Sequence, residues 1–226
     1  MKATGKRFFT NAMTGHLMAW SILLGTLWPA RALAQETVVV GIPTGAENAL
    51  EFVIRSDQDG AVLTHYGYLT HIFGLADEAL FSDPTIRTEA TAHFTFWATT
   101  TLTARQELGN LIITTALGTL TIYFNDTPGG DFNNPASFTR GRPIATYSVR
   151  HHNVLTVLAP NEGITLGVAE LAQLSAESFA LNAGSHRLGR PGLGARLQAS
   201  GQGRRTQVEP LKAFVLLGAH VIVTER

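Results

Sequence analysis

Two consecutive runs of alternating residues constrain this fold more than any other feature. In residues 91–103 the even positions are mainly apolar and the odd positions are mainly threonine. Residues 111–124 resume the same alternation after a turn-like stretch at 106–110. A period of two places one set of side chains on a buried face of a β-strand and the other on a wet face. The two runs predict a β-hairpin, and Gly118 in the second run predicts a bulge or bend.

Similar patterns recur along the rest of the chain. Further strands are predicted at residues 37–42, 50–55, 61–73, 143–159 and 211–224. Residues 168–181 suit a helix as well as a strand, and strand is the preferred interpretation. A short helical turn is expected at residues 75–80, and the long connection at 125–142 could cover one end of the domain as a lid.

Many strands without strand–helix alternation predict an antiparallel all-β domain of eight to ten strands with at most one short helix. Long strands with one apolar and one threonine-rich face favour a β-barrel, because closure removes the sheet edges that promote aggregation. A β-sandwich is the alternative.

The N-terminal residues 1–34 have the pattern of a removable signal peptide. Lys2, Lys6 and Arg7 precede a short apolar stretch, and residues 32–34 read Ala-Leu-Ala, a small-x-small cleavage pattern. A retained anchor is the alternative, but polar and glycine residues interrupt the apolar stretch. We therefore expect an exported chain, periplasmic or extracellular, with a single β domain at residues 35–226 and no transmembrane segment after processing.

Composition excludes several classes of function. The chain has no cysteine, so it has no disulfide, thiolate metal site or cysteine nucleophile. Removal of residues 1–34 takes away four basic residues and no acidic one, which leaves 13 basic against 17 acidic residues and a net charge of −4. A mildly acidic exported chain is a poor candidate for binding nucleic acid. The sequence also lacks the phosphate-binding loop, the nucleophile elbow, the dinucleotide fingerprint and the H-E-x-x-H zinc motif.

The polar cluster Arg150-His151-His152-Asn153 interrupts an otherwise apolar alternation. Tyr147, His151 and Asn153 share odd parity with apolar neighbours, so a regular strand points them into the interior. We predict Tyr147, Arg150, His151 and Asn153 as candidate ligand-binding residues, with His151 able to act as an acid or base near neutral pH. A bulge that returns the histidines to solvent, or a hydrogen-bonded core histidine, is the competing interpretation.

Other polar groups give weaker signals. His65 and His71 share parity but lie about 20 Å apart along a strand, so they cannot share one ligand directly. Asp126, Asp131 and Asn133 supply oxygen atoms that could bind calcium, although such Asx- and Gly-rich runs are primarily turn formers. Residues 187–205 carry five arginines among glycines, which suit a carboxylate or phosphate partner but are also typical of solvated strand faces.

These observations leave two main functions open. A small apolar ligand held inside a barrel requires an internal cavity, whereas a non-catalytic interaction module at an envelope or extracellular surface has a packed interior. The alternative is a barrel-mouth isomerase or cyclase that uses His151. An outer-membrane barrel ranks last, because the wet face is threonine-rich rather than apolar. No cofactor is expected, and the oligomeric state stays open.

Overall fold

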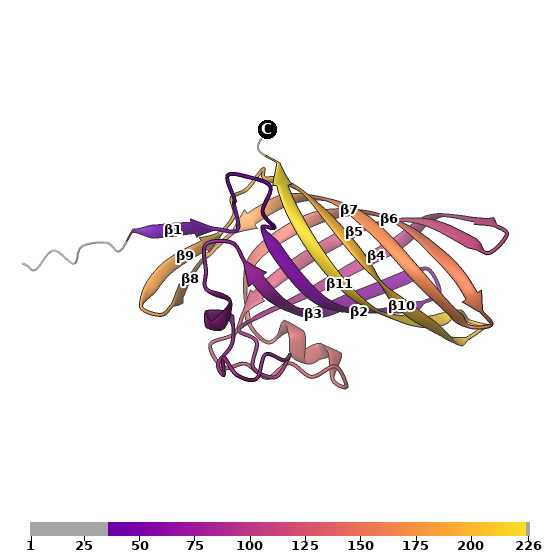
Figure 1. Cartoon of the computed structure of the whole chain (residues 1–226), viewed down its shortest axis with the longest axis horizontal. Helices are drawn as coiled ribbons and strands as arrows, with labels where there is room; N and C mark the ends of the chain where they lie inside the picture. Colours follow the sequence, from indigo (N-terminus) through magenta and orange to yellow (C-terminus); the bar gives the residue numbers. More distant parts are fainter. Residues whose placement is uncertain (1–35, 225–226) are drawn as a thin grey trace, which may run out of the picture. The chain divides into compact units, whose positions relative to one another are not determined.

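A computed structural model describes residues 36–224, and its main element is a closed antiparallel barrel of eight strands (Figure 1). The strand order is β10-β11-β2-β3-β4-β5-β6-β7. The bounds are β2 Leu50–Asp59, β3 Val62–Ile72, β4 Phe94–Leu108, β5 Leu111–Phe124, β6 Arg142–Ala159, β7 Glu162–Ala176, β10 Gly194–Gln207 and β11 Lys212–Thr224. The predicted all-β barrel is confirmed, and residues 168–181 are extended rather than helical.

Three short strands form a separate sheet in the order β1-β9-β8. They are β1 (Thr37–Val40), β8 (Ser178–Leu181) and β9 (Gly184–Leu188), with β1 parallel to β9. Two 3-10 turns, η1 (Asp77–Leu80) and η2 (Pro135–Thr139), are the helical elements among residues 36–224, and η1 confirms the short helical turn predicted at residues 75–80. Among residues 36–224, no helix is long and apolar enough to cross a membrane. The predicted signal peptide lies outside the described residues.

The barrel has two different ends. Tight hairpins join β2 to β3, β4 to β5, β6 to β7 and β10 to β11, and their turns form what we call the hairpin end. Gly60, Gly109 and Asn161 have positive φ angles of 59°, 62° and 67°, as tight hairpin turns require. Residues 106–108, which were predicted as part of a turn, belong to β4 instead. The longer connections meet at the opposite, connection end.

Gly118 does not form a bulge; it allows the backbones of two neighbouring strands to approach closely. Strand β5 keeps an unbroken register with both neighbours there, while the register shift of the hairpin falls between Leu102 and Ala104 of β4. A Cβ atom on Gly118 would lie 1.9 Å from the carbonyl oxygen of Thr99. The prediction of a bulge at Gly118 was wrong, because the glycine admits the neighbouring strand and the extra residue sits on that strand.

The half of the barrel nearest the connection end is packed with large apolar side chains. Leu69, Ile72, Phe94, Ile122 and Phe124 are almost completely buried there, together with residues from β1 and β8. The aromatic rings of Phe94, Phe124 and Phe179 contact one another at centroid distances of 5.2 and 5.3 Å. This packed half fixes the strands that continue toward the hairpin end.

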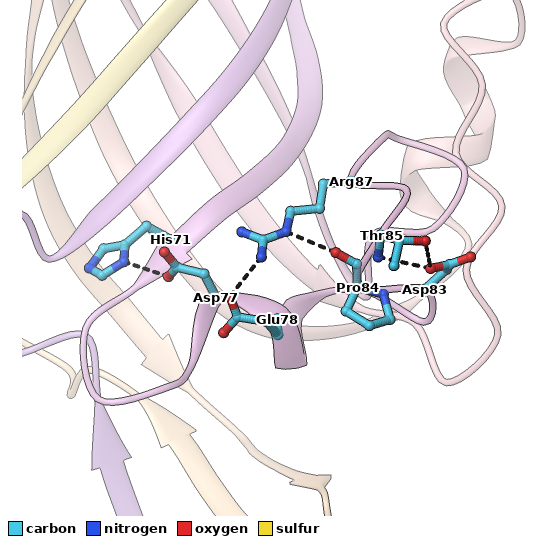
Figure 2. A network of polar contacts seen from close by, with 7 residues as sticks. All are labelled: His71, Asp77, Glu78, Asp83, Pro84, Thr85 and Arg87. Atoms are coloured by element: carbon cyan, nitrogen blue, oxygen red, sulfur yellow. Dashed lines mark hydrogen bonds and ion pairs between the residues drawn. The ribbon is translucent and has the colours of Figure 1, made fainter.

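The connection from β3 to β4 is held by polar contacts (Figure 2). His71 Nδ1 lies 2.8 Å from Asp77 Oδ1, and Arg87 Nη2 lies 2.6 Å from Glu78 Oε1. Asp83 accepts hydrogen bonds from both the backbone and the hydroxyl of Thr85. Because His71 contacts Asp77, its side chain lies at the connection end and not in the cavity of the barrel.

Residues 125–141 lie against the outer face of the barrel rather than over an end. Phe132 and Phe138 pack on Tyr66 of β3 at centroid distances of 6.1 and 5.3 Å. Phe138 is completely buried, and its carbonyl accepts a hydrogen bond from Thr95. The expectation of a lid was wrong, because these aromatic side chains bury themselves against outward-facing Tyr66.

Candidate functional site

The hairpin half of the barrel encloses a cavity of about 90 Å³. All eight barrel strands contribute inward-facing side chains to its lining. Most of these are apolar, and many are small. The small and polar members are Ser56, His65, Ala98, Thr100, His151, Asn153, Thr165, Gly167, Ala169 and Ala199.

A second hollow of about 200 Å³ lies between this cavity and the hairpin turns. The two spaces adjoin, because five residues line both of them: Ser56, Leu63, Asn153, Thr165 and Val215. Its outer part is bordered by exposed residues of the turns, including Asn161 and Arg205. The interior therefore opens at the hairpin end, and we call this outer part the mouth.

A hydrogen-bonded chain crosses the cavity wall at His65. The imidazole Nδ1 lies 2.6 Å from the hydroxyl of Ser56 on β2, and Nε2 lies 3.1 Å from the hydroxyl of Thr100 on β4. A neutral imidazole donates through one nitrogen and accepts through the other, so both of its polar atoms are satisfied. The chain holds the His65 ring in a fixed orientation.

His151 on β6 faces His65 across the barrel. Their ring centroids are 5.8 Å apart and the rings are nearly perpendicular, at 87°. Unlike His65, His151 has no hydrogen-bond partner within residues 36–224. Asn153, one inward position further along, accepts a hydrogen bond from Thr165 through Oδ1, and its amide nitrogen has no partner among the described residues. The cavity wall thus contains polar groups that make no hydrogen bond to the described part of the chain.

Gly167 on β7 leaves space beside these groups. A Cβ atom there would lie 2.8 Å from His151 Nε2 and 3.1 Å from Asn153 Oδ1. Any side chain at this position would push the imidazole or the amide from its place. Glycine at 167 therefore keeps both polar groups in the cavity wall.

Both histidines are held in the neutral form. Burial, with a smaller contribution from the nearby His151, lowers the pKa of His65 to about 3. Burial lowers the pKa of His151 to about 4, with an additional contribution from His152. The apolar surroundings disfavour the charged imidazolium, so the cavity contains no cation near neutral pH.

The structure brings together two of the four predicted ligand-binding residues. His151 and Asn153 line the same cavity, as their parity indicated. Tyr147 is buried further along β6 and lines a separate small void in the packed half, where burial raises the pKa of its phenol. Arg150 is exposed on the outer face, since its parity is opposite to that of His151.

Sequence reasoning missed His65, Ser56, Thr100 and Thr165 as parts of this site. The signal for His65 was its shared parity with Leu63, which faces the same interior. Strands β3 and β6 are not neighbours in the barrel order, so no local pattern could pair His65 with His151. Their meeting follows from barrel closure.

The three candidate calcium ligands, Asp126, Asp131 and Asn133, are exposed. The Oδ1 atom of Asp131 accepts a hydrogen bond of 2.8 Å from the backbone nitrogen of Asn133, which is the geometry of an Asx turn. Within residues 36–224, no group of three or more histidine or acidic side chains is placed to hold a metal ion. Asp131 thus has a structural partner of its own.

Comparison of the chain with protein-family models, with curated proteins and with solved structures gives no match. The fold alone does not indicate a specific function, because barrels support many unrelated ones. The chemistry of the cavity must therefore carry the functional argument.

Proposed function

We propose that this chain is an exported binding protein that holds a small, mainly apolar molecule inside the barrel. The observation that carries the proposal is the pair of adjoining hollows inside the barrel, which have apolar walls and polar groups without hydrogen-bond partners among the described residues. Small-molecule sites have this composition, with a few placed polar groups in an apolar pocket. An interaction module has no need of such a hollow.

The cavity chemistry admits a neutral buried end of the ligand, either apolar or carrying one carbonyl or hydroxyl group, but not a charged one. The imidazole of His151 and the amide of Asn153 offer a donor and an acceptor for a carbonyl or hydroxyl group. A charged group there would lose its hydration without meeting an opposite charge, because both histidines are neutral. The inner cavity of about 90 Å³ is smaller than the apolar cavity of about 150 Å³ that binds benzene in a protein, so a ligand would also occupy the adjoining hollow of about 200 Å³.

A second candidate function is proton-transfer catalysis of the isomerase or cyclase type. The observation that favours it is the lone His151, which faces the cavity, stays unprotonated and lacks a protein hydrogen bond. Such an imidazole could accept a proton from a bound molecule and return it at another atom. His65, held by Ser56 and Thr100, would position the ligand beside it.

Fluorescence titration with the neutral apolar dye N-phenyl-1-naphthylamine tests the binding function. Ala169 lies beside His151 in the strand register and lines the cavity, so Ala169→Leu fills it and should weaken dye binding at least about tenfold. Ala199→Leu fills the cavity from β10 and provides an independent variant. Ala172→Leu, which faces outward on the same strand as Ala169, is the matched control and should bind as wild type.

Native mass spectrometry of the purified protein gives a second measurement. A co-purifying small molecule that is released on denaturation, and is lost in Ala169→Leu but kept in Ala172→Leu, supports the proposal. Absence of dye binding in the folded wild-type protein, or equal binding by all variants, overturns it. Circular dichroism establishes that each variant is folded before the comparison is made.

A further inference from the structure

The mouth of the barrel carries an unusual balance of charge. Arg105 from β4 and the adjacent Arg204 and Arg205 from β10 line it, whereas Glu162 is its one acidic lining residue among residues 36–224. We call these three arginines the arginine rim. The deeper cavity contains no charged side chain among its lining residues. Positive charge is therefore concentrated where the hollow meets solvent.

The members of the arginine rim differ in how they are paired. Arg204 Nη2 lies 2.9 Å from Glu162 Oε1, and Arg105 forms an ion pair with Glu107. Arg205 has no carboxylate partner within the described part of the chain. Its guanidinium uses one of five N–H groups, so the other donors stay available for a ligand.

Arg205 is nevertheless held in place at the mouth. Its Nε donates a hydrogen bond of 2.8 Å to Asn161 Oδ1, and its backbone nitrogen donates one of 2.9 Å to the Asn161 carbonyl. Asn161 occupies the positive-φ position of the β6–β7 turn, which fixes the acceptor. A guanidinium fixed through Nε presents its two terminal nitrogens together, as recognition of a carboxylate requires.

The interior determines which way an amphipathic molecule would enter. A carboxylate at the depth of His65 and His151 would be buried without a cation, since burial keeps both imidazoles neutral. An apolar chain there would contact apolar side chains. From His151 to Val157, at the mouth, is about 20 Å of strand, enough for a medium-length alkyl chain.

We propose that the arginine rim binds the carboxylate of an amphipathic ligand whose apolar chain extends into the barrel. This inference rests on the proposed binding function and adds the chemical class of the ligand, a medium-chain carboxylic acid. Arg205 provides the main contact, because it shares the odd parity of the inward-facing residues of β10, whereas Arg204 shares the parity of Arg196 and is paired with Glu162.

Isothermal titration of decanoate and of 1-decanol to the full-length protein tests this inference. Decanoate should bind more tightly than 1-decanol, and Arg205→Gln should weaken decanoate binding about three- to tenfold while leaving 1-decanol unchanged. Higher salt should weaken decanoate binding alone, because the rim is exposed. Arg196→Gln is the matched control, since Arg196 lies on the outer face of the same strand.

The outcomes separate this inference from the proposed function. If 1-decanol binds and decanoate binds no tighter, or if Arg205→Gln leaves decanoate binding unchanged, the rim is not a carboxylate site although the barrel still binds ligands. If Arg196→Gln weakens decanoate binding as much as Arg205→Gln, general charge attraction replaces the specific site. If decanoate, 1-decanol and the naphthylamine dye all fail to bind, the proposed function fails as well.

Discussion

The two halves of the barrel are built from the same strands yet differ in their interiors. In the half nearest the connection end, inward positions carry large side chains such as Phe52, Phe94 and Ile122, all buried. In the hairpin half, inward Leu63 and Leu155 remain partly exposed because they line a hollow. Alternation decides which side chains point inward, whereas side-chain size decides whether the interior is filled.

Strand β7 shows this change along one element. Its inward positions near the mouth are Gly163, Thr165, Gly167 and Ala169, and the next is Leu171. Gly163, Thr165 and Gly167 leave space in the hairpin half, whereas Ala169 and Leu171 belong to the apolar core and line the inner end of the cavity. The packed half therefore supplies most of the apolar burial, which frees the hairpin half to remain open for a ligand.

Two leucines on β3 provide the largest test of this contrast. Leu69 is completely buried in the packed core, whereas Leu63 lines the hollow on the same strand. We expect Leu69→Ala to lower the free energy of unfolding by about 3 kcal/mol, because it leaves a cavity in a packed region. Leu63→Ala should lower it by less than about 1 kcal/mol, since part of its surface already faces open space. Urea denaturation measures both changes.

Each variant acts as the control for the other, because the chemical change is identical. Their m-values should match that of the wild type, which would establish that the extent of unfolding is unchanged. Similar losses of stability for the two variants would contradict the division into a packed and an open half.

The second test uses acidity, because the neutral histidines lie in the open half. The folded pKa of His151 is about 4, below its ordinary value of 6.5, so the unfolded chain binds a proton that the folded chain excludes. The contribution of neutral His151 to the free energy of unfolding is fully present above pH 6.5 and is lost as the pH falls toward 4. The wild-type free energy of unfolding should fall between neutral pH and roughly pH 5, and in His151→Gln this fall should be smaller by about 1–2 kcal/mol. Urea denaturation at each pH measures the difference.

His152→Gln is the matched control for the acid test. His152 is the next residue on β6 and is exposed on the outer face, where it makes only the smaller contribution to the low pKa of His151, so its loss should change the acid dependence far less than the loss of His151. An unchanged acid dependence in His151→Gln would show that this imidazole is not kept neutral by the cavity. Burial of His151 against apolar walls would then be contradicted.

The fold could be predicted from the sequence because strand alternation is a local property. Residues 91–103 and 111–124 fixed the inward face, and the same parity placed His151 and Asn153 inside. The depth of a residue within the barrel was not predictable, since it depends on register between strands, and this misplaced Tyr147 in the site. The loop at 125–142 was mistaken for a lid because nothing local indicates that Phe138 packs on Tyr66.

The site itself required closure of the barrel. Ser56, His65 and Thr100 come from three adjacent strands, and His151 faces them from a fourth. Each is an ordinary strand residue when considered alone. The hollow was also not predictable, because it arises from the coincidence of small residues on several strands at one level.

The smallest expected effect concerns the acidic member of the mouth. Glu162 and Glu170 lie on β7 and each pairs with an arginine of β10, Arg204 and Arg196 respectively, but only the first pair borders the hollow. Because Glu162→Gln removes a negative charge beside the proposed carboxylate position, it should raise the affinity for decanoate about two- to threefold. It should change the free energy of unfolding by less than about 0.5 kcal/mol, since the ion pair is exposed.

Glu170→Gln removes the same charge from the outer face and should leave decanoate affinity unchanged. An equal gain in both variants, measured by isothermal titration, would mean that net charge attracts the ligand, and the contrast between the mouth and the outer face would then carry no specificity.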